Sequence, residues 1–238
     1  MKEPSTNLLA RASIVDGDAA KDADSNVVRC AANLFLQKGI EGVKMVDIAK
    51  AANIGVATLY RHFSTKTRIA ALAATLLWDQ FNLRLVDLVE SNAFLDLDGI
   101  GRLRALLEGY CDAYGSHADF VSFVDEFDHL ILSGQLNDSE LREYDSHIDS
   151  FYPIFEDAYL LGLTDGSIVR QIDFRQFYLT LAHAIMGVAQ KLCRGEVIPS
   201  DDFSHGGIEL RSIVNMALWS LVSDKSVPPT PETARLKG

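Results

Sequence analysis

The stretch from Lys44 to Lys66, KMVDIAKAANIGVATLYRHFSTK, constrains the fold of this chain more than any other. It contains two short segments of helical apolar period separated by a tight turn. In the second segment, Leu59 and Phe63 are four residues apart, so they share one face of a helix while the opposite face stays free. Asn53 stands at the turn, and after Gly it is the residue that best tolerates a left-handed backbone. The pattern predicts a helix-turn-helix.

Two runs in and around this stretch carry a more specific likeness. They are GIEGVKMVDIAKAANIG at 39–55 and VATLYRHFSTK at 56–66. Over roughly residues 24–70 the chain resembles the DNA-binding unit of the TetR family of transcriptional repressors. The resemblance implies an all-α fold with an N-terminal three-helix DNA-binding head and a C-terminal helical body that binds an effector and dimerises. It further implies that movement of the connecting helix changes the spacing of the two heads.

The net charge of −11 is unevenly distributed along the chain. Between residues 24 and 70 there are seven basic and three acidic residues, which gives +4, so the remainder carries −15. Phosphate binding needs Lys and Arg. An acidic body joined to a basic head therefore suits a protein in which only the head meets DNA.

Composition divides the chain into four predicted segments. Residues 1–23 lack a sustained period and contain Pro, Gly, Ser and Asp, which predicts a disordered leader. The helix-turn-helix head is predicted at 24–66, with its first helix ending at a C-cap on Gly39. The effector-binding and dimerisation body is predicted at 67–224, and a flexible tail at 225–238.

The body is predicted to be helical throughout, because no alternation of strand period runs for a useful length. We expect its helices near 67–89, 98–115, 118–132, 138–162, 173–194 and 206–223. Pro153 lies inside the fourth of these, where it should kink the helix near Ser150.

Seven head residues are candidates for DNA contact: Lys44, Val56, Ala57, Thr58, Tyr60, His62 and Lys66. By the resemblance, Tyr60, His62 and Lys66 contact the DNA backbone; packing or capping inside the head is the alternative for the first two. Val56 and Ala57 offer only apolar contacts, such as those with thymine methyl groups. Thr58 can bond a base edge or a phosphate.

Lys44 stands where family members usually have a Thr that caps the second helix. A lysine side chain cannot accept a backbone hydrogen bond, so this helix start should lose about 1 kcal/mol of capping free energy. The lysine is free to contact phosphate instead.

Two helices of the body are apolar nearly all round, which predicts a second buried face on each. The same helices of a second chain would supply it, in a four-helix interface about a two-fold axis. The candidate interface residues are Phe177, Leu181, Ala184, Gly187, Val188, Ile213, Val214, Ala217 and Leu218. The alternative is one large core that encloses both helices in a single chain.

Aromatic side chains spread over the body helices predict an apolar effector pocket with few polar groups. The candidates are Trp78, Phe81, Tyr110, Phe123, Phe127, Asp128, Tyr144, Phe151, Tyr152 and Tyr178. Asp128 is included because it falls inside an apolar arc, where a carboxylate needs a partner or a raised pKa. Core packing for the aromatic residues, and contact with water or an Arg for Asp128, are the alternatives.

The predicted function is that of a homodimeric repressor, released from a pseudo-palindromic double-stranded DNA operator by a small apolar or aromatic effector. The sequence contains no nucleophile elbow, phosphate-binding glycine loop or clustered metal ligands, so we expect neither catalysis nor a cofactor. No run of 18 apolar residues is present, and we expect a cytoplasmic protein without a membrane span. Two alternatives are a dimeric ligand- or partner-binding module with degraded DNA readout, and an enzyme that uses Asp128 or His129.

Overall fold

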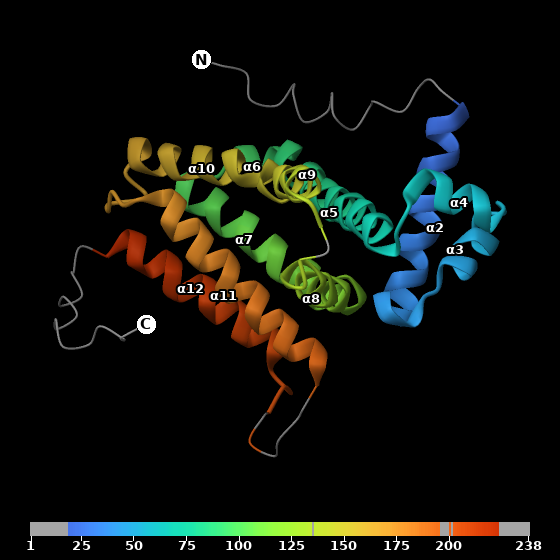
Figure 1. The fold of residues 1–238 in the computed structure, drawn as a ribbon. Coiled ribbons are helices and arrows are strands. Elements are labelled where there is room, and N and C mark those ends of the chain that lie inside the picture. The colour runs from blue at the N-terminus through green and yellow to red at the C-terminus, as the bar shows by residue number, and fades with distance from the viewer. Residues whose placement is uncertain (1–18, 135, 196–199, 201, 224–238) are drawn as a thin grey trace. The chain divides into compact units, whose positions relative to one another are not determined.

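The computed structural model describes residues 19–134, 136–195, 200 and 202–223. Over these residues the chain is built from helices and contains no strand, which confirms the predicted all-α class (Figure 1). The helices are α2 (Ala19–Gly42), α3 (Met45–Ala51), α4 (Val56–Phe63), α5 (Lys66–Glu90), α6 (Asn92–Leu95), α7 (Gly99–Ser116), α8 (Ala118–Leu132), α9 (Asp138–Ile148), the 3-10 helix η1 (Asp149–Phe151), α10 (Tyr152–Asp165), α11 (Phe174–Arg194) and α12 (Gly206–Val222).

The observed bounds follow the predicted ones closely, with three differences. Residues 19–23, predicted as part of the leader, form the first residues of α2. The short helix α6 was not predicted. The expected kink near Ser150 is a break, since η1 separates α9 from α10 and Pro153 lies in the first turn of α10. The rest of the predicted leader and the predicted tail lie outside the described residues.

The chain separates into two compact units by its internal contacts. The first unit comprises residues up to Leu77 together with Glu126–Tyr144, and the second comprises Trp78–Asp125 together with the residues from Asp145 onward. The unit boundaries therefore fall within α5, α8 and α9, whereas the predicted head ends at residue 66.

In the first unit, α2, α3 and α4 form a small three-helix group, here called the head. Its core is made of side chains at helical spacing: Val27, Ala31 and Phe35 from α2, Ile48 from α3, and Leu59 and Phe63 from α4. Asn53 has φ 56°, which confirms the left-handed turn predicted between α3 and α4. Gly39 has φ 72° and ends the regular part of α2, as expected.

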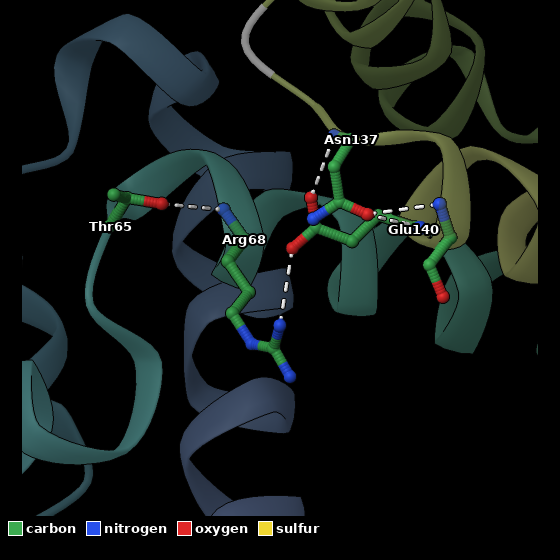
Figure 2. A network of polar contacts seen from close by, with 5 residues as sticks. Thr65, Arg68, Asn137 and Glu140 are labelled. Atoms are coloured by element: carbon green, nitrogen blue, oxygen red, sulfur yellow. Dashed lines mark hydrogen bonds and ion pairs between the residues drawn. The ribbon is translucent and has the colours of Figure 1, made fainter.

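A polar network joins the start of α5 to the start of α9 within the first unit. Figure 2 shows Arg68 donating from Nη1 to Glu140 over 3.2 Å, while the Arg68 backbone N–H donates to the hydroxyl of Thr65. Asn137 caps α9, because its side-chain oxygen accepts from the Ser139 and Glu140 N–H groups. The ion pair adds little free energy at this exposure, but it fixes the side chains that start two helices.

In the second unit, α7 packs against α10, α11 and α12. α7 and α10 approach closely at Gly99, where a Cβ atom would lie 2.0 Å from the backbone nitrogen of Gly162. α11 and α12 lie side by side (Figure 1). The interior is rich in stacked rings, with Phe81 5.4 Å from Tyr110 and 5.0 Å from Tyr114 between ring centroids.

Candidate DNA-binding surface and ligand cavity

The recognition helix α4 has one buried and one exposed face. Leu59 and Phe63 are 0% and 3% exposed and hold α4 against the head. On the other face Val56 is 39% exposed and Tyr60 50% exposed, and Ala57 is exposed as well. Gly55 provides an N-cap without a side chain, and the α4 N-terminus thus presents a small apolar surface to the outside.

The other predicted DNA-contacting residues differ in exposure and in hydrogen-bond partners. Lys44 is exposed at the start of α3 and Thr58 is half-buried. The Lys44 side chain caps nothing, as expected, although Asp47 accepts from the Lys44 backbone N–H over 3.0 Å and so completes half of a capping box. Contact of the exposed Lys44 side chain with a phosphate stays a prediction.

His62 and Lys66 already have partners inside the first unit. His62 Nδ1 lies 2.8 Å from a carboxylate oxygen of Asp24. The Lys66 ammonium donates to the carbonyl oxygens of Ile40, at 2.7 Å, and Val43, at 3.0 Å. The predicted phosphate contact of Lys66 stays a prediction, and the structure gives its ammonium a second use.

The turn that Lys66 holds is also bound from α8, a contact that sequence reasoning missed. A carboxylate oxygen of Glu126 accepts from the Ile40 backbone N–H over 2.5 Å. The two residues are 86 positions apart. Periodicity along one segment cannot reveal a partner at such a separation.

A cavity of about 60 Å³ lies in the second unit. Its walls are Trp78, Leu107, Tyr110, Tyr114, Ile148, Tyr178, Ala182 and Ile185. Trp78, Tyr110 and Tyr178 are thus the predicted effector-binding residues that line it. Tyr114 was missed, although its position one helical turn after Tyr110 on α7 was a usable signal.

The other predicted effector-binding residues do not line this cavity. Phe127 and Tyr144 pack edge-to-face in the first unit at 4.9 Å, and Asp128 of the same unit is half-buried. Phe81, Phe123 and Phe151 are buried in the second unit, and Tyr152 lies under the guanidinium of Arg175 at 4.3 Å. These seven positions were chosen by residue type and by periodicity, neither of which fixes which helix faces meet around a cavity.

The polar side-chain groups of the cavity wall are the hydroxyls of Tyr110, Tyr114 and Tyr178 and the indole N–H of Trp78. Tyr110 and Tyr178 share a side-chain hydrogen bond. Burial raises the pKa of Tyr110 well above its ordinary value, and burial likewise raises the pKa of Tyr178 to about 12. Both groups therefore remain protonated near neutral pH and can donate or accept a hydrogen bond.

The predicted dimer-interface residues fall into three groups. Leu181, Val214 and Leu218 are buried within the chain, at 5%, 0% and 2% exposure, so they belong to its core and not to an open interface. Phe177, Val188, Ile213 and Ala217 are half-buried, and Ala184 and Gly187 are exposed. The apolar residues that α12 leaves open are Ile208, Met216, Trp219 and Val222.

Two features are absent from the described part of the chain. No helix there is long and apolar enough to cross a membrane. No group of three or more His, Cys, Asp or Glu side chains there is placed to hold a metal ion.

The exposed face of α4 on a three-helix head is the arrangement of a helix-turn-helix DNA-binding domain. Residues 27–73 match the family described as bacterial regulatory proteins, tetR family. Residues 27–73 thus carry the N-terminal domain of the TetR family of regulators.

A similar protein is the HTH-type transcriptional regulator SAR0097 of Staphylococcus aureus, which is 29% identical over 94 residues. That match covers 39% of this chain and spans about half, 48%, of the relative's length.

Two solved structures share the fold at low identity. A TetR-family regulator from Rhodococcus sp. superposes with a TM-score of 0.61 at 17% identity, over 85% of this chain and 100% of that one. The fatty acid degradation regulator FadR from Bacillus halodurans gives 0.58 at 14% identity, over 82% of this chain and 97% of that one.

Proposed function

We propose that this chain is a cytoplasmic homodimeric repressor that leaves a pseudo-palindromic operator when a small, uncharged, aromatic-bearing molecule binds in its second unit. The observation that carries the proposal is the cavity walled by Trp78, Tyr110, Tyr114 and Tyr178. Pockets that bind small molecules are mostly apolar with a few polar groups, as this one is. A charged ligand would lose its hydration there, because no charged side chain stands among the lining residues.

The size of the cavity implies that the effector displaces side chains as it enters. About 60 Å³ is well below the roughly 150 Å³ of a cavity known to hold benzene. An effector can shift the protein between two states only by binding one of them more tightly. Movement of the lining rings supplies such a difference between the empty and the occupied state.

The homodimer rests on the faces that α11 and α12 leave open. Ile208, Met216 and Trp219 of α12 are 64%, 65% and 68% exposed, and Trp is a residue type that often anchors interfaces. Ala184 and Gly187 are exposed on α11 and permit close approach of a second helix. Sedimentation of the full chain should therefore give a dimer.

The test of repression is selection of bound sequences from a random duplex pool, followed by release with neutral aromatic compounds. A specific sequence that is retained, and then lost on addition of a compound, supports the proposal. If a specific sequence is bound and no compound releases it, the proposed effector response is wrong. Compound binding without any selected sequence would favour the ligand-binding module with degraded DNA readout.

Ligand entry has an independent readout in tryptophan fluorescence. The chain has two tryptophans, Trp78 and Trp219. A Trp219→Phe variant leaves Trp78 as the sole indole, and an effector in the cavity should change its emission. A compound that releases DNA but leaves this emission unchanged would place the effector elsewhere.

A further inference from the structure

The exposed side chains in the first turn of α4 are apolar. Side chains that contact base edges from this part of a recognition helix are ordinarily polar. The first turn of a recognition helix is the part that reaches base edges. In this chain that turn runs Val56, Ala57, Thr58 after Gly55, and its two exposed side chains, those of Val56 and Ala57, are purely apolar. Thr58 is half-buried and has the only side-chain hydrogen-bonding group of the turn.

The neighbouring polar side chains do not supply base readout from this turn. His62 is paired with Asp24, and Lys66 donates to two backbone carbonyls of the head. Tyr60 and Arg61 are exposed, but both lie in the second turn of α4. The exposed polar side chains near α4 are thus suited to binding phosphates. Such contacts position the protein on the duplex but do not distinguish one base sequence from another.

In the major groove, one base carries an apolar group of its own. Thymine presents a 5-methyl group, and small apolar side chains recognise it by contact. Exposed Lys44, Lys50 and Arg61 supply the positive charge that brings this surface to the duplex. Resting on the DNA-binding function above, we propose that the chain reads its half-site mainly through thymine methyl groups packed against Val56 and Ala57.

The proposal predicts a definite loss of affinity when a methyl group is removed. Uracil differs from thymine only by that methyl, so the hydrogen-bonding edge is unchanged by the exchange. The transfer free energy of one buried carbon group corresponds to a roughly fourfold change in binding constant. Replacing any one contacted thymine by uracil should therefore weaken binding about fourfold.

The experiment uses the full chain and its selected duplex, with uracil replacing thymine one position at a time and fluorescence anisotropy at fixed salt as the readout. We expect one or two sensitive positions in each half-site. In a Val56→Ala variant the affinity ratio of thymine to uracil duplex should shrink toward one at the position that Val56 contacts, because the two valine methyl groups are gone, and any position that Ala57 contacts should keep its penalty. Alanine is a better helix former than valine, so this variant keeps its fold.

Val46→Ala is the matched control, since Val46 is a 53% exposed valine of the same head that lies on α3. It should keep the full uracil penalty. Uracil duplexes that all bind at full affinity, as a guanine-reading Arg61 would allow, would overturn the inference and leave DNA binding intact. A Val56→Ala variant that keeps the full penalty at every sensitive position would also overturn it. A pool that yields no bound sequence would overturn the DNA-binding function together with this inference.

Discussion

Replacing Lys66 by Met tests whether this lysine stabilises the head or contacts DNA. Met keeps most of the length of the side chain and removes the ammonium, which donates to Ile40 and Val43 over 2.7 and 3.0 Å. Hydrogen bonds from a charged donor contribute about 1.5–3 kcal/mol each. Because Lys66 is half-exposed, water replaces part of what is lost, and we expect a total loss of about 1–3 kcal/mol in the free energy of unfolding.

Two measurements separate the roles of Lys66. Urea denaturation reports stability, and the slope of log K against log salt concentration counts phosphate contacts, falling by about one for each contact removed. We expect Lys66→Met to lower stability, and the predicted phosphate contact of Lys66 should in addition lower the slope by about one. Lys44, an exposed lysine of the same head, provides the control. Lys44→Met should lower the slope by about one and change the free energy of unfolding by no more than about 0.5 kcal/mol. Unchanged stability with a reduced slope in Lys66→Met would refute the structural role.

Three further outcomes are expected. Gly39→Ala should lower the free energy of unfolding by about 1–3 kcal/mol, because φ 72° and ψ 163° suit only glycine, whereas Gly42→Ala should have little effect in thermal denaturation; equal effects would contradict this. Burial raises the pKa of Cys111 to about 11 from an ordinary value of 9, so stability should fall as pH rises from about 9 to 11, and less steeply in Cys111→Ser if the thiol is responsible. Trp219→Ser should give a monomer in sedimentation, unlike Leu160→Ser at another exposed apolar site; a Trp219→Ser dimer would exclude the α12 face.

The sequence predicts most reliably what local geometry determines. Asn53 was expected in a left-handed turn and has φ 56°, and Gly39 was expected to end the first helix and has φ 72°. The limits of α7, α8, α11 and α12 follow from caps and periodicity in the same way. Each of these signals lies within a few residues of the feature that it predicts.

The features that the sequence could not predict depend on which faces of the helices pack against one another. Val214 and Leu218 form a stripe four residues apart that α12 buries within its own chain, while Met216 and Trp219 stay open. The sequence of α12 offers both sets of residues as apolar faces. Only the packing of α12 against α7 and α11 determines which of the two faces is buried. The same holds for the cavity, where Tyr114 lines the wall and Phe81 stacks behind it.

Glu126 shows most directly how a distant residue fixes the head. Its carboxylate accepts the Ile40 N–H, and Ile40 is 3% exposed, so water cannot readily replace the bond. Glu126→Ala should leave this donor unpaired, at a cost of about 1–3 kcal/mol, whereas Glu126→Gln keeps an acceptor oxygen and should cost less.

Amide hydrogen exchange at Ile40 measures the bond to Glu126 directly. The rate should rise in Glu126→Ala and stay close to that of the unaltered chain in Glu126→Gln; equal rates in the two variants would mean that the carboxylate does not protect the turn. The turn at Gly39 precedes α3, and α3 packs on α4, so the residue that fixes the turn also fixes the helices that follow it. A loss of DNA affinity in Glu126→Ala, with the α4 surface unaltered, is therefore the expected consequence of loosening that turn.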